Sequence, residues 1–369
     1  MTLPPALARI LARIRPAHIV FIVVMLYLGA VYAFNGRGVW EFIFPVRTEG
    51  KGYDGQFTYF IARDPLGAVE LQQFQIDDPA YRYQRILHPV LARLLSLGND
   101  ALLPWVIVGI DVIMLVVGVM ALERLLAAQG VNRWHALTYG LFAGVVAATR
   151  AGTTEPLAYG LVLLAILFGE RGRLGFQAVF FALAALAKEP TLFFAAGYIL
   201  AYLSQRRGRD AFHLGVIAFV PFALWQVVLY LWLGRFGIGS GGAGATGFEI
   251  IPFNGIWRIA AESLPVFLYF APYLIIGVVI PTIYALIASG VDLLQRRWQP
   301  YVILVFLNAA LILTVPFSTF REPFGIIRFL PGLVISFLLY AALCAQWGRS
   351  RRPLRYAPLW ILWGMVLFG

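Results

Sequence analysis

The sequence predicts an all-α protein, a polytopic bundle of transmembrane helices, from its composition and the pattern of its apolar stretches. Of 369 residues, 61% are hydrophobic and 13% are charged, and the mean hydropathy is +0.80. Soluble domains average about 45–50% apolar and about 25% charged residues, so this chain cannot build a water-soluble surface. Its apolar stretches are continuous and do not alternate over segments of about ten residues, which favours helices over a β-barrel.

Basic residues in short loops set the expected orientation of the spans, and we interpret the net charge of +11 as this topology signal rather than as affinity for nucleic acid. Arg9, Arg13 and Arg15 precede the first span, so the N-terminus is expected in the cytoplasm. Alternation between basic loops gives about eleven spans in one integral membrane domain, 1–369. They cover 19–34, 102–126, two hairpins within 136–168 and 174–204, 213–233, 264–289, 301–316, 329–346 and 356–368.

The two hairpins are predicted because polar segments interrupt long apolar stretches. TRAGTTEP occupies 149–156 and KEP occupies 188–190, while both ends of each stretch are basic. Both ends are therefore expected in the cytoplasm, with the polar tips on the outer side. Each arm has about 14 residues, short of the roughly 20 needed to cross a bilayer. The tips are then expected below the outer surface, beside an outward-facing aqueous cavity.

Three outer loops complete the expected organisation: a first extracytoplasmic loop at 35–100, a glycine-rich second loop at 234–262 and a third at 317–328. Within the first loop, YRYQRILHPVLARLLSLG at 81–98 has apolar residues at helical spacing, which is typical of a helix lying in the membrane interface. The expected apolar face consists of Ile86, Leu87, Val90, Leu91, Leu94 and Leu95.

The first outer loop also contains an acidic, aromatic-rich segment, GYDGQFTYFIARDP at 52–65. Asp54, flanked by Tyr53 and Gln56, has two compatible interpretations. It is a general base that takes a proton from a hydroxyl group, or it is the N-cap of a helix that begins at Gly55. Asp64, which precedes a proline, is expected to be a turn residue.

The polar tips supply further candidates. Lys188 is expected to neutralise a phosphate and Glu189 to orient a sugar hydroxyl; alternatively, these two neighbours pair with each other. Glu155, in the other tip, has the same two interpretations, and Arg150 lies beside it in the sequence.

Three arginines are further candidates for a site on the outer side. Arg321 and Arg328, in the third outer loop, offer a planar fork for phosphate, although Arg321 is also placed to pair with Glu322. Arg85 is either a ligand for an anion or a side chain that reaches lipid head groups. The histidines have no zinc spacing, and the glycine-rich segment lacks the lysine of a nucleotide-binding loop, so no metal or other cofactor is predicted.

GYDGQFTYFIARDP, the following YRYQRILHPVLARLL and the later LAKEPTLFF resemble bacterial, mannosyltransferase-like members of the GT-C superfamily of integral membrane glycosyltransferases. The resemblance implies a polyprenyl-phosphate-linked sugar donor and inverting transfer to a hydroxyl of a glycan, lipid or protein. It also implies a site on the outer face of a bacterial inner membrane, with Asp54 as the base. Cations stabilise the departing phosphate, and the candidates are Lys188, Arg321 and Arg328. In one departure, the second acid of the first loop follows ten residues later, at Asp64.

The implied site residues are therefore Asp54 as the catalytic base and, for substrate binding, Tyr53, Gln56, Arg85, Arg150, Glu155, Lys188, Glu189, Arg321 and Arg328. Two other classes of protein remain open: a transporter or lipid flippase with an outward-facing polar cavity, and a structural membrane protein. Transporters often contain inverted repeats. No repeat is evident here, and the charged groups gather on one expected side, which favours an enzyme.

Overall fold

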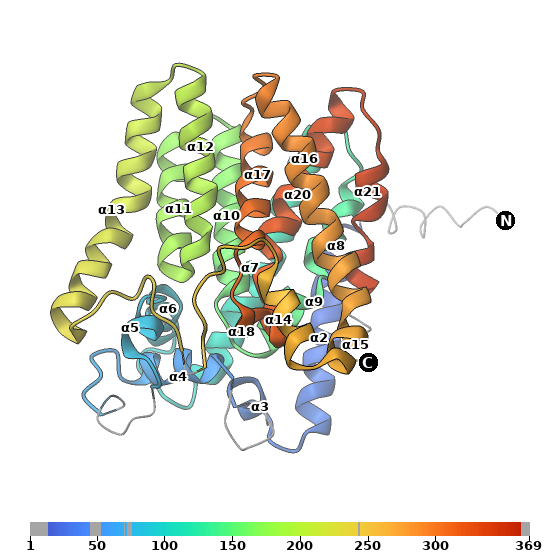
Figure 1. The fold of residues 1–369 in the computed structure, drawn as a ribbon. Helices are drawn as coiled ribbons and strands as arrows, with labels where there is room; N and C mark the ends of the chain where they lie inside the picture. Colours follow the sequence, from blue (N-terminus) through green and yellow to red (C-terminus); the bar gives the residue numbers. More distant parts are fainter. Residues whose placement is uncertain (1–13, 45–52, 70, 72–75, 243, 363–369) are drawn as a thin grey trace, which may run out of the picture.

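The computed structural model describes residues 14–44, 53–69, 71, 76–242 and 244–362, and those residues contain helices and no strand (Figure 1). The predicted all-α class is confirmed for this part of the chain, and four of its helices are long and apolar enough to cross a membrane. They are α2 (Pro16–Phe34), α7 (Leu103–Ala128), α13 (Gly208–Leu233) and the continuous helix Leu264–Leu294, formed by α15 (Leu264–Leu274), a π-helical segment (Ile275–Val279) and α16 (Ile280–Leu294).

A fifth candidate span is bent. Helices α19 (Pro323–Phe329) and α20 (Pro331–Gln346) meet at an angle of 41°. Helix α17 (Pro300–Leu313) is apolar but shorter, and α21 (Arg352–Tyr356) follows α20. The predicted last span, 356–368, lies partly outside the described residues, and the total of eleven spans remains a prediction.

The apolar stretch 174–204 folds as the predicted hairpin. Helices α11 (Leu174–Ala187) and α12 (Leu192–Ser204) have 14 and 13 residues, and Lys188 to Pro190 form the turn between them with a short 3₁₀ helix at Glu189–Thr191. The Tyr202 hydroxyl near the end of α12 donates to Gln177 near the start of α11 at 2.7 Å, so the arms are antiparallel.

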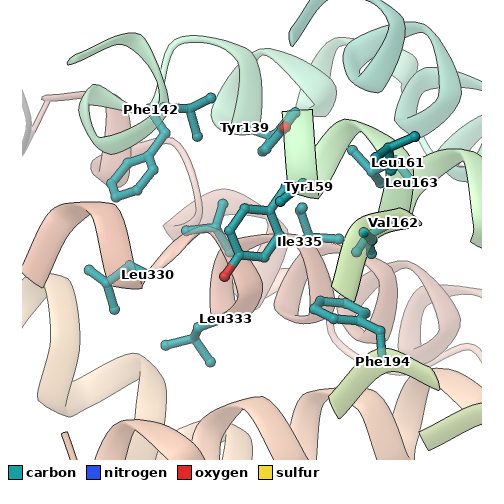
Figure 2. Close-up of a cluster of buried hydrophobic side chains, with 14 of the residues drawn as sticks. Tyr139, Phe142, Tyr159, Leu161, Val162, Leu163, Phe194, Leu330, Leu333 and Ile335 are labelled. Atoms are coloured by element: carbon teal, nitrogen blue, oxygen red, sulfur yellow. The ribbon is translucent and has the colours of Figure 1, made fainter. Parts of the chain in front are cut away.

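The stretch 136–168 is interrupted twice rather than once. A 3₁₀ turn (Arg133–Ala136) leads into α8 (Leu137–Gly140), α9 (Ala143–Arg150) and, after the predicted tip, α10 (Glu155–Glu170). The additional break falls at Leu141 and Phe142. Figure 2 shows Phe142 and the ring of Tyr159 in one apolar cluster with Leu330, Leu333 and Phe194. This cluster joins α10 to α12 and to the α19–α20 bend, and it fixes the start of α10 in the bundle.

In its described residues, the first outer loop forms four short helices. They are α3 (Trp40–Ile43), α4 (Gly55–Arg63), α5 (Pro79–Tyr83) and α6 (Leu87–Leu95), so the expected single interfacial helix over 81–98 is wrong. The Trp225 indole donates to the carbonyl of Tyr83 at 2.8 Å, and a continuous helix would offer that carbonyl to residue 87. The chain turns between α5 and α6 at this point.

The predicted apolar face of α6 is divided, because Leu87 and Leu91 pack against the core. His88, Pro89 and Ala92 are buried, whereas Leu94 and Leu95 of the expected apolar face are exposed. An exposed apolar face suits a helix in contact with lipid.

The bundle has two different ends. Helices α4, α5 and α6 lie at one end (Figure 1), together with α14 (Asn254–Glu262) and α18 (Phe317–Arg321) of the second and third outer loops. The turns that join α12 to α13, α16 to α17 and α20 to α21 lie at the opposite end, which we call the basic end. These turns contain Arg206, Arg207, Arg296, Arg297, Arg349 and Arg351.

Candidate functional site

Asp54 begins α4, but its side chain is not used as a helix cap in the described part of the chain. Its two oxygens instead accept hydrogen bonds from Arg82 at 2.8 Å and from Arg328 at 2.9 Å. Gly55 allows this position, because a Cβ there would lie 1.8 Å from the carbonyl oxygen of Ala151. Backbone contact therefore brings the start of α4 against the first polar tip.

Arg328 connects the first outer loop to the polar tips. It reaches Glu155 with two donors, at 2.7 Å and 2.9 Å, while it also contacts Asp54. Glu155 in turn accepts from Lys188 at 2.5 Å. The Glu155 side chain is completely buried, whereas that of Asp54 is 30% exposed. Glu155 therefore holds two cations in the buried part of the site. Asp54, which is partly exposed, is the carboxylate that a ligand can reach.

Two more arginines belong to the site: Arg82 in α5 and Arg85 just after it. Arg82 forms a bidentate pair with Asp77, at 2.7 Å and 2.8 Å, and donates its remaining terminal nitrogen to Asp54. Arg85 forms a bidentate pair with Glu189, at 2.8 Å and 3.0 Å. We call these residues the charged network; its members are Asp54, Asp77, Arg82, Arg85, Glu155, Lys188, Glu189 and Arg328.

Aromatic rings flank two of the arginines. The Arg328 guanidinium lies 4.7 Å from the centre of the Tyr53 ring, and the Arg82 guanidinium lies 3.9 Å from that of Phe57. Phe324 packs edge-on against Tyr53 at 4.4 Å. These rings hold the guanidinium planes through cation–π contacts in a partly desolvated place.

The charged network contains as many carboxylates as cations, so its charges cancel. Burial by itself would raise the pKa of Asp54, but the guanidinium groups of Arg328 and Arg82 outweigh that effect and hold the pKa well below its ordinary value of 3.8. Asp54 is therefore ionised at neutral pH. While both arginines are bound to it, Asp54 is also a weak base.

A cavity of about 20 Å³ lies beside Asp54, enough for roughly one water molecule. Asp54, Arg82, Arg85 and Arg328 line it, together with Thr153 and Thr154 of the first polar tip. The space beside Asp54 is therefore far smaller than the expected aqueous cavity, and Asp54, Arg82, Arg85 and Arg328 around it are all in ion pairs.

The structure joins most of the predicted site residues and separates others. Asp54, Arg85, Glu155, Lys188, Glu189 and Arg328 belong to the charged network, and Tyr53 lies against it. Arg150 lies outside it and pairs with Glu41 at 3.1 Å. Arg321 is exposed, with its guanidinium over the ring of Phe317. Gln56 is half-buried in the first turn of α4.

Two of the alternatives are decided by these contacts. Lys188 and Glu189 do not pair with each other as neighbours, because each has a partner from another element, Glu155 and Arg85. Asp64 is a turn residue as expected: its carboxylate accepts from the Val69 amide at 2.6 Å just after α4.

Sequence reasoning missed Arg82, which contacts Asp54 directly. Its spacing from Arg85 was the available signal, since residues three apart lie on one helix face. Sequence reasoning also missed His88 and Asp111, both fully buried, with Nε2 and Oδ1 3.7 Å apart. They lie on α6 and on the long apolar helix α7, where an ionisable residue is rare.

Comparison of the chain with protein-family models, with curated proteins and with solved structures gives no match. A function therefore has to be argued from the residues of the site.

Proposed function

We propose that the chain is a membrane glycosyltransferase that moves a sugar from a polyprenyl-phosphate-linked donor to an acceptor hydroxyl, with inversion, using Asp54 as the general base. One observation carries the proposal: the partly exposed Asp54 carboxylate is held between two arginines that come from different parts of the chain. A carboxylate next to paired cations suits a reaction that needs a base and a phosphate-binding group at one place.

The phosphate of the donor and Asp54 compete for the same cations in this proposal. A sugar phosphodiester carries one negative charge, and arginine binds phosphate oxygens through its planar fork. When the phosphate takes Arg82 or Arg328, Asp54 loses a hydrogen-bond donor and its pKa rises toward the ordinary value. Donor binding therefore converts a weak base into a stronger one.

The transfer step then follows from these positions. The acceptor O–H gives its proton to Asp54 as its oxygen attacks the anomeric carbon. The bond between that carbon and the phosphate oxygen breaks, and polyprenyl phosphate leaves with the bonding electrons. Arg82 and Arg328 stabilise the charge that develops on the departing phosphate. Lys188, bound to the buried Glu155, acts on Arg328 through that carboxylate rather than by contact with the donor.

Entry of a sugar phosphate requires movement of α5. The cavity of about 20 Å³ is too small for a sugar, and Arg82 of α5 is one of the residues that line it. The glycine-rich second outer loop packs against this helix. Its Arg235 pairs with Asp78 at 2.7 Å, and a Cβ at Gly242 would lie 2.5 Å from the Arg82 guanidinium. The proposal therefore includes an open form in which α5 and this segment move away from Asp54.

The proposed topology has about eleven spans in a GT-C-like arrangement, with the charged network facing the exterior of a bacterial inner membrane. Helices α4 and α5, which carry Asp54 and Arg82, lie at the end opposite the basic turns (Figure 1), and this separation supports it. Cysteine labelling at Leu66 and Ile250, which are exposed residues of the first and second outer loops, tests this orientation. Both positions are expected to react from the outside, and labelling from the cytoplasm alone would contradict the arrangement.

The direct test of function uses purified protein and synthetic polyprenyl-phosphate sugars, with release of polyprenyl phosphate as the readout. Asp54→Asn is expected to lower the rate by about 10²–10⁴-fold, the usual contribution of a positioned base. Asp64→Asn is the matched control, because the Asp64 carboxylate accepts from the Val69 amide in the turn after α4 and does not belong to the charged network. Release that survives Asp54→Asn would rule out Asp54 as the base.

A further inference from the structure

A groove of about 1000 Å³ lies at the basic end of the bundle. The turns of this end lie opposite α4, α5 and α6 (Figure 1). The groove lies between the last turn of α12, the turn from α16 to α17 and the turn from α20 to α21. The residues that matter to its chemistry are Leu200, Leu203, Arg296, Trp298, Trp347 and Arg349. A volume of this size is that of a ligand pocket rather than of a packing defect.

The groove has an excess of positive charge. Asp292, a buried residue of α16, accepts from Arg349 at 2.7 Å and 2.9 Å and from Arg297 at 3.2 Å. One carboxylate therefore faces two arginines. Arg296 is exposed, lines the groove and forms no ion pair with any residue that the structure describes. An anion entering the groove meets three arginines, Arg296, Arg297 and Arg349, of which two share the single carboxylate of Asp292.

The same groove has an apolar side. Leu200 and Leu203, on the last turns of α12, are exposed, and the Trp298 side chain is also exposed. The Trp347 ring lies 4.9 Å from the Arg349 guanidinium and 5.5 Å from that of Arg297. Tryptophans gather at the level of lipid head groups, where one part of the side chain meets apolar chains and another meets water. The groove is therefore amphipathic along its length.

We infer that this groove binds an anionic phospholipid, with its phosphate on Arg296 and Arg349 and its acyl chains along Leu200 and Leu203. Basic residues after a helix are common because they interact favourably with its last carbonyls. That general effect accounts for arginine in each separate turn. It does not account for a large groove between three such turns with exposed leucines on one side. The inference is independent of the proposed glycosyl transfer.

The experiment uses the full chain in neutral detergent and counts bound lipid by native mass spectrometry during titration with phosphatidylglycerol. Arg296→Gln is expected to weaken binding about fivefold, the usual effect of one basic residue near an anionic head group. Arg206→Gln is the matched control, because Arg206 and Arg296 both have φ near +60° and are both exposed, yet only Arg296 lines the groove. The Asp292 ion pairs stay intact in both variants, and their melting temperatures check the fold.

Selective binding of phosphatidylglycerol over phosphatidylcholine, weakened by Arg296→Gln and unchanged by Arg206→Gln, supports the site. Equal weakening by both substitutions would overturn it, since attraction would then be a property of the whole basic end. Competition by inorganic phosphate at equal concentration would also overturn it, because the occupant would be a free anion rather than a lipid.

Discussion

The Arg328 guanidinium donates to the Asp54 carboxylate at 2.9 Å, across 274 positions of the chain. This pair joins the proposed base to a proposed phosphate-binding cation. While it is formed, Asp54 is a weak base and Arg328 is not available to a phosphate, so neither residue performs its proposed role until a donor binds. The arrangement keeps Asp54 ionised in the free protein and makes its basicity depend on the ligand.

The competition predicts an unusual effect of Asp54→Asn on affinity. The variant should bind a polyprenyl-phosphate donor about tenfold more tightly than the wild type, because the phosphate no longer displaces a charged hydrogen bond worth about 1.5–3 kcal/mol. Isothermal titration with a non-hydrolysable donor measures this, with Asp64→Asn as the control. Weaker binding by Asp54→Asn would mean that the phosphate does not use Arg82 or Arg328.

The pH dependence of transfer should report the same competition. In the free protein the pKa of Asp54 lies below 3.8, so its carboxylate stays ionised as the pH falls through its ordinary range. In the donor complex the arginines are taken by phosphate, and the pKa rises. The acid limb of kcat, which reports the complex, is therefore expected at higher pH than that of kcat/KM, which reports the free enzyme. Coincident limbs would argue against displacement of Asp54.

Arg82 should contribute to donor binding even though α5 must move. Arg82→Gln removes a cation that contacts Asp54 and Asp77, and it is expected to weaken donor binding about 10-fold to 100-fold, as loss of a charge-assisted contact does. Arg93→Gln is the matched control on the neighbouring helix, since Arg93 pairs with the exposed Asp100 at 2.8 Å. Equal losses in the two variants would indicate a general charge effect.

Composition and arginine placement in the sequence were sufficient to predict a membrane-helical chain and the hairpin around Lys188. They also indicated that the first outer loop, the tips and Arg328 belong together. The partners of each side chain were not predictable, because Arg328 meets Asp54 and Glu155 only through the packing of α4, α10 and α19. The break between α5 and α6 depends on Trp225, a residue of α13 about 140 positions away. Local periodicity contains no information about such a contact.

The buried pair of Glu155 and Lys188 is expected to matter more for stability than an exposed pair of similar length. Lys188→Met leaves the completely buried Glu155 with Arg328 alone and should lower the free energy of unfolding by about 3–5 kcal/mol. Adding Glu155→Gln should recover part of this loss, because the excess negative charge of the network is then removed. Arg207→Gln, which breaks the exposed pair with Asp210, should cost less than about 1 kcal/mol. Thermal melting in detergent measures these three variants and Glu155→Gln alone, and additive losses at 155 and 188 would contradict the coupling.

The close approach of α4 to the first polar tip gives a test that involves no charge. In Gly55→Ala the added Cβ would meet the Ala151 carbonyl oxygen at 1.8 Å, so the start of α4 must shift and Asp54 must move away from Arg328. The variant is expected to lower both the melting temperature and transfer activity. Gly109→Ala is the control: no atom lies within 4 Å of its added Cβ, and alanine favours a helix interior by up to about 1 kcal/mol. If Gly55→Ala kept full activity, the position of Asp54 set by this backbone contact would not be needed for the reaction.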